Sequence, residues 1–253
     1  SSMHGKASVF LLFAGIGLAV LAALVPFAQI RHIELAPGSA LSLAEVKAIC
    51  GIGEHPRWFS TDTEALALAL RSDPRVASAQ VRMRFPATLS IAVVDRVAAA
   101  VVYARSASGR MEAHCVDAHG VVFAPACAHK DRGALPVLSG LEIRALRYGM
   151  QLDGPFVTVL ASMARLATTE PALAMAISEL RVVSRSGAQA ELLVYPAHYR
   201  LPVRMGTELD ATLVKSFLLV LDVVESGNLG VSVSELDFRS DTYVLRTKEA
   251  VSG

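Results

Sequence analysis

The chain lacks the residue patterns on which small catalytic and metal-binding modules are usually built. It has only three cysteines in 253 residues, and no two of them form a C-x-x-C pair. The sequence therefore does not support zinc-ribbon or thioredoxin-like chemistry. It also has no Gly-x-Ser-x-Gly sequence, the turn that carries the nucleophile of α/β-hydrolases, so a serine hydrolase is not favoured.

An excess of charge of one sign is also missing. The 24 lysines and arginines are balanced by 23 aspartates and glutamates, which leaves a formal net charge of +1. No basic block is available to neutralise a phosphate backbone, and we therefore expect no nucleic-acid partner. The sequence has no low-complexity tract, and with 53% hydrophobic residues it has enough apolar material for a core.

Near its start the chain lacks formal charge altogether, because all 24 residues between Lys6 and Arg31 are uncharged. A helix of that length is about 36 Å long, enough to cross a hydrocarbon layer of ~30 Å. A cleaved signal peptide would have a shorter apolar region and a better cleavage site than Pro26-Phe27-Ala28, and a buried core helix would have a polar face. We predict an uncleaved transmembrane helix at 9–29 in contact with membrane lipid, preceded by a short tail at 1–8.

Two capping boxes predict helices after the apolar run. In Ser42-x-x-Glu45 and again in Thr61-x-x-Glu64, the hydroxyl and the carboxylate can satisfy each other's backbone N–H groups at a helix start. Each box is followed by apolar residues at helical spacing. The sequence therefore predicts one helix beginning after Ser42 and a second beginning after Thr61.

Alternating apolar and polar residues predict three strands around these helices, at 30–34, 76–85 and 89–93. Trp58 and Phe59, just before the second box, are predicted to pack into the core. The order strand, helix, helix, strand, strand fills residues 30–96. We expect these residues to form one domain.

The rest of the chain predicts a mixed β domain with flanking helices at 97–246, followed by a tail at 247–253. An Asp117-x-x-Gly120 turn, with Asp bonding the turn backbone and Gly supplying a positive φ, divides 115–123 into two strands. Further strands are predicted at 101–105, 180–183, 190–195, 199–205 and 233–246, and helices around 156–166 and 209–224.

Side chains near this turn offer two chemical alternatives. His114, Asp117 and His119 are residue types that bind metals, but the turn already accounts for Asp117, and we predict no metal site. Cys115 and Cys127 flank a predicted hairpin and could form a disulfide if the domain is exported; two separate thiols are the alternative.

Five short motifs, taken in order, resemble the FtsQ/DivIB family of bacterial cell-division proteins. The resemblance extends from the apolar run to Leu245. Its motifs are Asp73-Pro74-Arg75-Val76, Phe85-Pro86-x-Thr88-Leu89, Val116-Asp117-x-x-Gly120, Leu135-Pro136-x-Leu138-x-Gly140 and Leu236-Asp237-x-Arg239.

The resemblance implies a fold and a role without a reaction. It implies an α+β chain: an N-terminal transmembrane helix, a POTRA domain of β-α-α-β-β order, then a β domain. It further implies a cytoplasmic N-terminus, an extracytoplasmic C-terminal domain, and a place in the inner membrane at the division septum. Such proteins are scaffolds without cofactors that link early and late divisome proteins. They bind FtsB and FtsL through the β domain, and their POTRA domain is implicated in contacts such as that with FtsK.

The candidate partner-binding residues lie in the predicted last strand. A terminal strand can leave a sheet edge open to a partner strand. Arg239 matches the Arg of the family's Asp-x-Arg segment and could pair with a partner carboxylate. The alternative is that Asp237 and Arg239 form a solvated face of the strand. Tyr243 stands in for an aromatic residue that the family has directly after this Arg, where this chain has Ser240. The candidates are Asp237, Arg239, Ser240, Tyr243 and Val244, with Arg185 as a further candidate.

One alternative function remains open at this point. A POTRA domain also occurs in chaperones and translocation accessory proteins of the envelope. A band at midcell would favour the cell-division scaffold, whereas a uniform envelope signal would favour the accessory protein.

Overall fold

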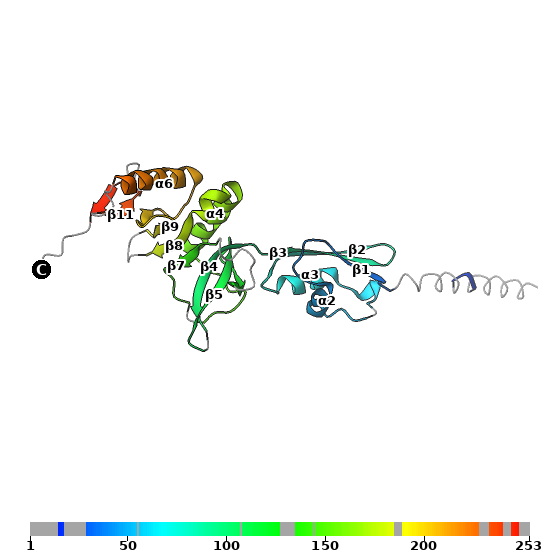
Figure 1. Cartoon of the computed structure of the whole chain (residues 1–253). Helices are drawn as coiled ribbons and strands as arrows, with labels where there is room; N and C mark the ends of the chain where they lie inside the picture. Colours follow the sequence, from blue (N-terminus) through cyan, green and yellow to red (C-terminus); the bar gives the residue numbers. More distant parts are fainter. Residues whose placement is uncertain are drawn as a thin grey trace, which may run out of the picture. The chain divides into compact units, whose positions relative to one another are not determined.

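A computed structural model of the chain describes residues 15–17, 29–54, 56–106, 108–126, 135–143, 145–184, 189–227, 233–239 and 244–247. The chain divides into two compact units, Ser1–Asp95 and Arg96–Gly253, here called the first unit and the second unit (Figure 1). Both combine helices with β-sheet, which confirms the predicted α+β class.

The predicted transmembrane helix at 9–29 lies outside the described residues, except for residues 15–17, which are helical, and Gln29. Within the part of the chain that the structure describes, no helix is both long enough and apolar enough to span a membrane.

The first unit is a three-stranded sheet with two α-helices packed on it. In the order β1-β3-β2, β1 (His32–Leu35) is parallel to β3 (Thr88–Asp95), and β2 (Val76–Arg84) is antiparallel to β3. Between β1 and β2 the chain forms α2 (Leu43–Cys50), the short 3-10 helix η2 (Trp58–Ser60) and α3 (Thr63–Arg71). The predicted β-α-α-β-β order is therefore confirmed. The fully buried members of its core include Val46, Leu70, Leu89 and Ile91.

Both α-helices of the first unit begin at residues that cap them, and one of the two caps lies one residue later than predicted. At α2 both halves of the predicted box are present: the Glu45 N–H donates to Ser42 Oγ at 3.2 Å, and the Ser42 N–H donates to Glu45 Oε2 at 2.9 Å. At α3 the N-cap is Asp62 rather than the predicted Thr61, because the Asp62 carboxylate accepts two N–H groups of the first turn. A carboxylate also complements the positive end of the helix.

The two aromatic residues before α3 have different surroundings. Trp58 is half-buried and packs against the core, as predicted. Phe59 is 85% exposed, so the prediction that it packs in the core was wrong. Successive side chains of a 3-10 helix point about 120° apart, and only one of these two can face the sheet.

Arg75, from the Asp73-Pro74-Arg75 motif, ties the loop before β2 to the first turn of α2. Its guanidinium bonds Asp73 at 2.9 Å and Glu45 at 3.1 Å. The Ser42 N–H, the Ser42 hydroxyl and Arg75 together lower the pKa of Glu45 from 4.5 to about 2. The motif therefore has a structural role in holding the loop against the helix.

Replacing Glu45 with glutamine is expected to reduce the acid sensitivity of the first unit. Because the pKa of Glu45 is lower in the folded chain, its stabilising effect is complete above pH 4.5 and is lost as the pH falls toward about 2. Urea unfolding of the full chain, followed by the fluorescence of its one tryptophan, Trp58, measures this at neutral pH and at about pH 3. Glu45→Gln should lose less stability between the two pH values than the wild type. Equal losses would contradict the prediction.

The second unit is built on one mixed sheet with the strand order β12-β11-β10-β9-β8-β7-β4-β5-β6 among the described residues (Figure 1). The strands are β4 (Ala98–Arg105), β5 (Met111–Asp117), β6 (Val122–Pro125), β7 (Val137–Ser139), β8 (Ile177–Val183), β9 (Glu191–Pro196), β10 (Val203–Met205), β11 (Val233–Asp237) and β12 (Val244–Thr247). The helices are α4 (Pro155–Thr169), α5 (Pro171–Met175) and α6 (Ala211–Ser226).

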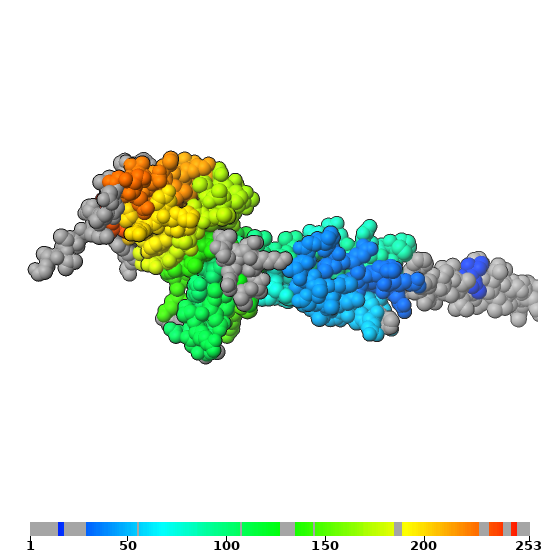
Figure 2. Space-filling model, viewed as in Figure 1, coloured from blue at the N-terminus to red at the C-terminus, as the bar shows by residue number. Residues whose placement is uncertain are grey.

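These helices pack on one face of the sheet, where the main core lies (Figure 1). In the space-filling view the yellow-green to orange atoms of the helical segments gather on one side of the second unit (Figure 2). Successive side chains of a strand point to opposite faces, so residues two apart share a face. Fully buried members of this core are Val159 and Leu160 from α4, Phe217 and Leu221 from α6, and Leu180, Val194, Val203 and Leu236 from the strands. The opposite face of the sheet carries two groups of residues. A small hydrophobic cluster that includes Val101 and Phe123 lies on β4–β6, and charged residues lie on β9–β12.

The predicted turn at Asp117 is present between β5 and β6. The Asp117 carboxylate accepts the N–H groups of His119 at 2.9 Å and Val121 at 2.8 Å, and Gly120 has φ +81°. Arg96 donates to the same carboxylate at 2.6 Å, in a pair that is largely buried. Asp117 is therefore used to hold the turn and to anchor the start of the second unit.

His114 contributes to a different contact of the fold. Its Nδ1 lies 3.1 Å from the hydroxyl of Tyr148, and the two rings meet edge to face. Burial lowers the pKa of His114, partly offset by the charge of Glu112. The neutral imidazole is therefore the favoured form in the fold.

Candidate protein-binding edge

Strand β12 forms one edge of the sheet in the second unit. It is antiparallel to β11, with Val244 opposite Asp237 and Leu245 opposite Leu236. In the described part of the chain, no strand pairs with the outer side of β12. An edge strand presents a row of backbone donors and acceptors, so a further strand can add to the sheet here.

The structure corrects the prediction of one long strand at 233–246. Two strands, β11 and β12, form a hairpin instead, and Asp237 lies on the inner strand while Arg239 follows its end. Of the predicted edge-strand residues that are described, only Val244 lies on the edge strand, where it is 52% exposed. Fourteen residues would be long for one strand, and Ser240 and Asp241 are turn-forming residue types in its middle.

Six charged residues on β9–β12 and directly after β11 form what we call the terminal charge cluster. Glu235 and Asp237 are two residues apart on β11 and share a face, while Leu236 between them is buried in the core below the helices. The cluster therefore lies on the face that the helices leave uncovered. Its members are Glu191, Arg204, Glu235, Asp237, Arg239 and Arg246.

Arg204 lies at the centre of this cluster. Its guanidinium donates to both carboxylate oxygens of Glu235 at 2.9 Å each, and to Glu191 at 2.7 Å. Its side chain is only 11% exposed. Fork-shaped bonding to a carboxylate is the strong geometry for an arginine, so β9, β10 and β11 are joined through one side chain.

Arg239 and Asp237 form the next link in the terminal charge cluster. Arg239 Nε lies 2.9 Å from Asp237 Oδ1, and Arg239 Nη2 lies 2.6 Å from Asp237 Oδ2. The same guanidinium also pairs with Glu191. The arginine that was predicted to face a partner carboxylate therefore bonds two carboxylates of its own chain.

Arg246 joins the edge strand to the rest of the cluster. It stands opposite Glu235 in the β11–β12 register, bonds Glu235 at 3.2 Å and bonds Asp237 at 2.9 Å. Its side chain is 44% exposed, so this link lies near the surface. Arg246 thereby fixes β12 to its neighbour by side chains as well as by backbone bonds.

The cluster balances three arginines against three carboxylates. Hydrogen bonds from Arg239 lower the pKa of Asp237, although burial opposes them. Burial raises the pKa of Glu191, but the bonds from Arg204 and Arg239 together outweigh it and the net shift is downward. The Glu235 carboxylate raises the pKa of Arg204. Asp237, Glu191 and Arg204 are therefore held in their charged forms at neutral pH.

Several predicted site residues lie outside the described part of the chain. These are Ser240, Tyr243, Arg185 and Cys127. Cys115 is fully buried on β5. Its disulfide with Cys127, like partner contacts of the other three residues, stays a prediction.

Sequence reasoning missed Glu191, Arg204, Glu235 and Arg246. The sequence did contain a signal for Arg204, because it is a charged residue with an apolar residue on each side, Val203 and Met205, in a predicted strand. The spacing Glu235-x-Asp237-x-Arg239 also predicts that these charged side chains point to the same face of a strand. Their partners lie 9 to 48 residues away in the chain, and only the pairing of the strands brings them together.

Comparison with known families identifies the first unit. Residues 28–96 match the family model described as "POTRA domain, FtsQ-type". The chain therefore has a POTRA domain followed by a β domain, here the second unit.

Curated relatives extend this identification beyond the POTRA domain. The cell division protein FtsQ of Syntrophotalea carbinolica is 27% identical over 180 residues, which are 70% of this chain and 60% of that protein. FtsQ of Anaeromyxobacter sp. (strain K) is 37% identical over 113 residues, 45% of this chain and 34% of the relative. FtsQ of Mycobacteroides abscessus is 29% identical over 116 residues, 46% of this chain and 36% of the relative.

The matched regions thus span from about a third to 60% of the length of these relatives. The resemblance that the motifs carry is confirmed by both comparisons. Residues 28–96 thus form a POTRA domain of the FtsQ type, and the chain is similar to cell division proteins named FtsQ.

Proposed function

We propose that the chain is a non-enzymatic scaffold of the divisome that captures FtsB, together with FtsL, by strand addition to β12. The observation that carries this proposal is the place of β12 at the edge of the sheet, paired on one side only among the described residues. A partner strand gains backbone hydrogen bonds there, while exposed side chains such as Val244 contribute specificity.

The proposal includes a topology. Residues 9–29 span the inner membrane once, residues 1–8 are cytoplasmic, and both folded units are extracytoplasmic at the division septum. The uncharged run between Lys6 and Arg31 supports the anchor. In this arrangement the POTRA domain is available to other divisome proteins, FtsK among them.

In this proposal the terminal charge cluster holds the β11–β12 hairpin in the geometry that a partner strand binds. Arg239 and Arg246 both bond Asp237, and Arg246 also reaches back from β12 to Glu235. These bonds hold the hairpin in one geometry before a partner arrives. A strand that is already ordered loses less conformational entropy on binding, which favours affinity.

Two matched truncations of the full chain test the proposal. Removing residues 240–253 deletes β12, whereas removing residues 248–253 leaves it intact. Co-purification from membranes should lose FtsB with the first truncation and retain it with the second. Arg239→Glu should also lose FtsB, because a fourth carboxylate beside Asp237 and Glu191 loosens the hairpin. Normal capture of FtsB by the chain that lacks β12 would refute strand addition.

A further inference from the structure

Three segments of the POTRA domain meet where the apolar run of the sequence ends. The backbone of residues 29–32 bonds Pro56 and pairs with Arg57 on one side, and bonds Ala87 on the other, with N···O distances of 2.8 to 3.2 Å. The short helix η2 and the turn between β2 and β3 are therefore both next to the residues that follow the uncharged run. This end of the domain is the part that the chain itself ties closest to residues 9–29.

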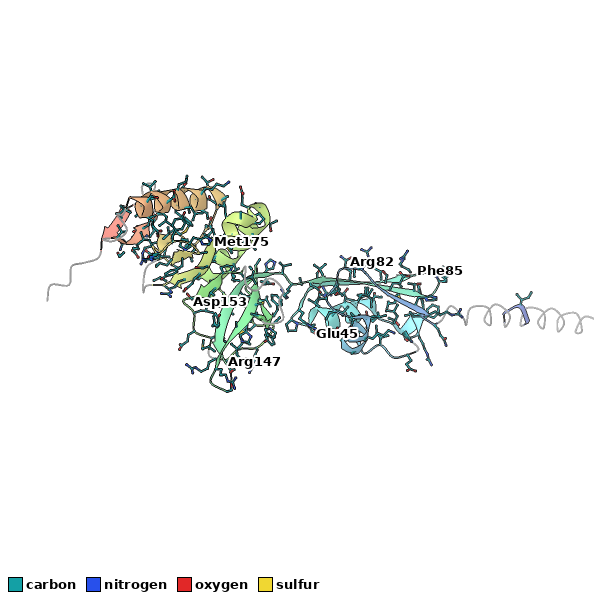
Figure 3. All side chains as sticks on the ribbon, viewed as in Figure 1. Glu45, Arg82, Phe85, Arg147, Asp153 and Met175 are labelled. Atoms are coloured by element: carbon teal, nitrogen blue, oxygen red, sulfur yellow. The ribbon has the colours of Figure 1, made fainter. Side chains whose placement is uncertain are left out.

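Two large aromatic side chains are exposed at this end. Phe59 on η2 is 85% exposed, and Phe85 in the β2–β3 turn is 80% exposed. Figure 3 shows Phe85 at the tip of the turn, close to Arg82. Exposed aromatic rings gathered at one end of a domain need a reason, because each ring costs free energy in water.

Exposed arginines lie on the same segments as these rings. Arg82 and Arg84 are exposed on β2, and the one carboxylate on β1 and β2 is Glu34, 3.4 Å from Arg84. Arg31 and Arg57 are exposed on the segments that lie beside each other before β1 and before η2. The four arginines outnumber the exposed carboxylates of these segments, Glu34, Glu54 and Asp62, so this end of the domain is aromatic with a small excess of basic charge.

We propose that this end of the POTRA domain docks on an anionic phospholipid surface, with Phe59 and Phe85 entering the headgroup region and the arginines pairing with lipid phosphates. The proposal rests on the transmembrane helix proposed above. Aromatic residues favour the interface between membrane and water, and basic residues near an anionic leaflet are attracted within a Debye length. Docking would fix the height and tilt of the POTRA domain, which a tether alone does not.

Trp58 is a built-in probe for this contact, because it neighbours Phe59 and is the one tryptophan of the chain. The full chain is reconstituted into vesicles of phosphatidylglycerol and phosphatidylcholine, some of which have a nitroxide on the lipid headgroup. Quenching of Trp58 is compared between the wild type and a Phe59→Ser/Phe85→Ser variant. Val94→Ser is the matched control, since Val94 is 57% exposed at the opposite end of β3.

Docking predicts strong quenching in the wild type and in Val94→Ser, and loss of most of it in the double variant. Quenching should also fall in vesicles of phosphatidylcholine alone and at high salt. Equal quenching in all three proteins would overturn the proposal and leave only a tethered domain. Quenching that requires an added partner protein would overturn it in favour of a protein interface. Extraction of the vesicles with alkaline carbonate tests the anchor separately, because a chain that washes off has no transmembrane helix.

Discussion

Replacing Arg204 with methionine is expected to lower the free energy of unfolding of the β domain by about 3 kcal/mol. The guanidinium is buried and bonds Glu191 and Glu235, whose side chains are 18% and 13% exposed. Its loss leaves two poorly solvated carboxylates facing each other. The expected cost is at the low end of the range for breaking a buried ion pair, because Arg239 still bonds Glu191 and Arg246 still bonds Glu235.

Burial should separate this variant from its neighbour in the same cluster. Arg246 also bonds two carboxylates, but its side chain is 44% exposed, so Arg246→Met is expected to cost only about 0.5–1 kcal/mol. Both losses of stability are measured by urea unfolding of the full chain, with hydrogen exchange of peptides from β9–β11 as the readout. The Trp58 transition of the POTRA domain should not move in either variant. Equal losses for the two arginines would contradict the role assigned to burial.

A neutral triple variant isolates charge from packing. In Glu191→Gln/Arg204→Met/Glu235→Gln no unpaired charge remains among the three residues. Buried ion pairs that are replaced by neutral groups of similar volume often cost little. The triple variant should therefore recover most of the stability that Arg204→Met loses. Failure to recover it would mean that the guanidinium acts mainly through its packing.

Replacing Gly140 with alanine is expected to destabilise the β domain by about 2–6 kcal/mol, the sum of backbone strain and steric overlap. Gly140 follows β7 with φ +89°, a region that residues with a Cβ rarely adopt. A Cβ there would lie 2.0 Å from the carbonyl oxygen of Val182 on β8. That oxygen belongs to the backbone of a central strand, so it cannot move aside cheaply.

Gly206→Ala is the matched control for this variant. Gly206 follows β10 in the same domain, and a Cβ there meets no atom within 4 Å. Its substitution should change stability little, or raise it slightly by restricting the unfolded chain. Denaturant unfolding of both variants gives the comparison. A Gly140→Ala protein as stable as the Gly206→Ala protein would show that β7 and β8 can separate without cost.

Local sequence signals predicted the POTRA domain well because its helices and strands are short and have clear start or pattern signals. The Ser42–Glu45 box and the alternation on β2 and β3 each act within a few residues. The same local reasoning also predicted the Asp117 turn and the apolar stripe of α6. The misplaced cap at α3 came from two neighbouring residues that can both serve as caps.

The edge strand β12 was harder to predict because it depends on sheet order. The motif around Asp237 and Arg239 lies at the end of the neighbouring strand β11, but alternation alone could not show a hairpin rather than one strand. β10 and β11 pair in parallel across a connection that contains α6, and Arg204 meets Glu235 only through that pairing. No local pattern encodes such a contact, so neither the bond from Arg204 to Glu235 nor the pairing of Arg239 with Glu191 on β9 was foreseen.

Hydrogen exchange at the backbone of β12 tests the central claim most directly. The full chain is compared alone and in complex with FtsB, and the amides of residues 244–247 are followed. Strand addition predicts new protection of the outward-facing N–H groups of β12, while those already paired with β11 change little. A stable complex in which residues 244–247 exchange as fast as in the chain alone would contradict the proposal that β12 captures the partner.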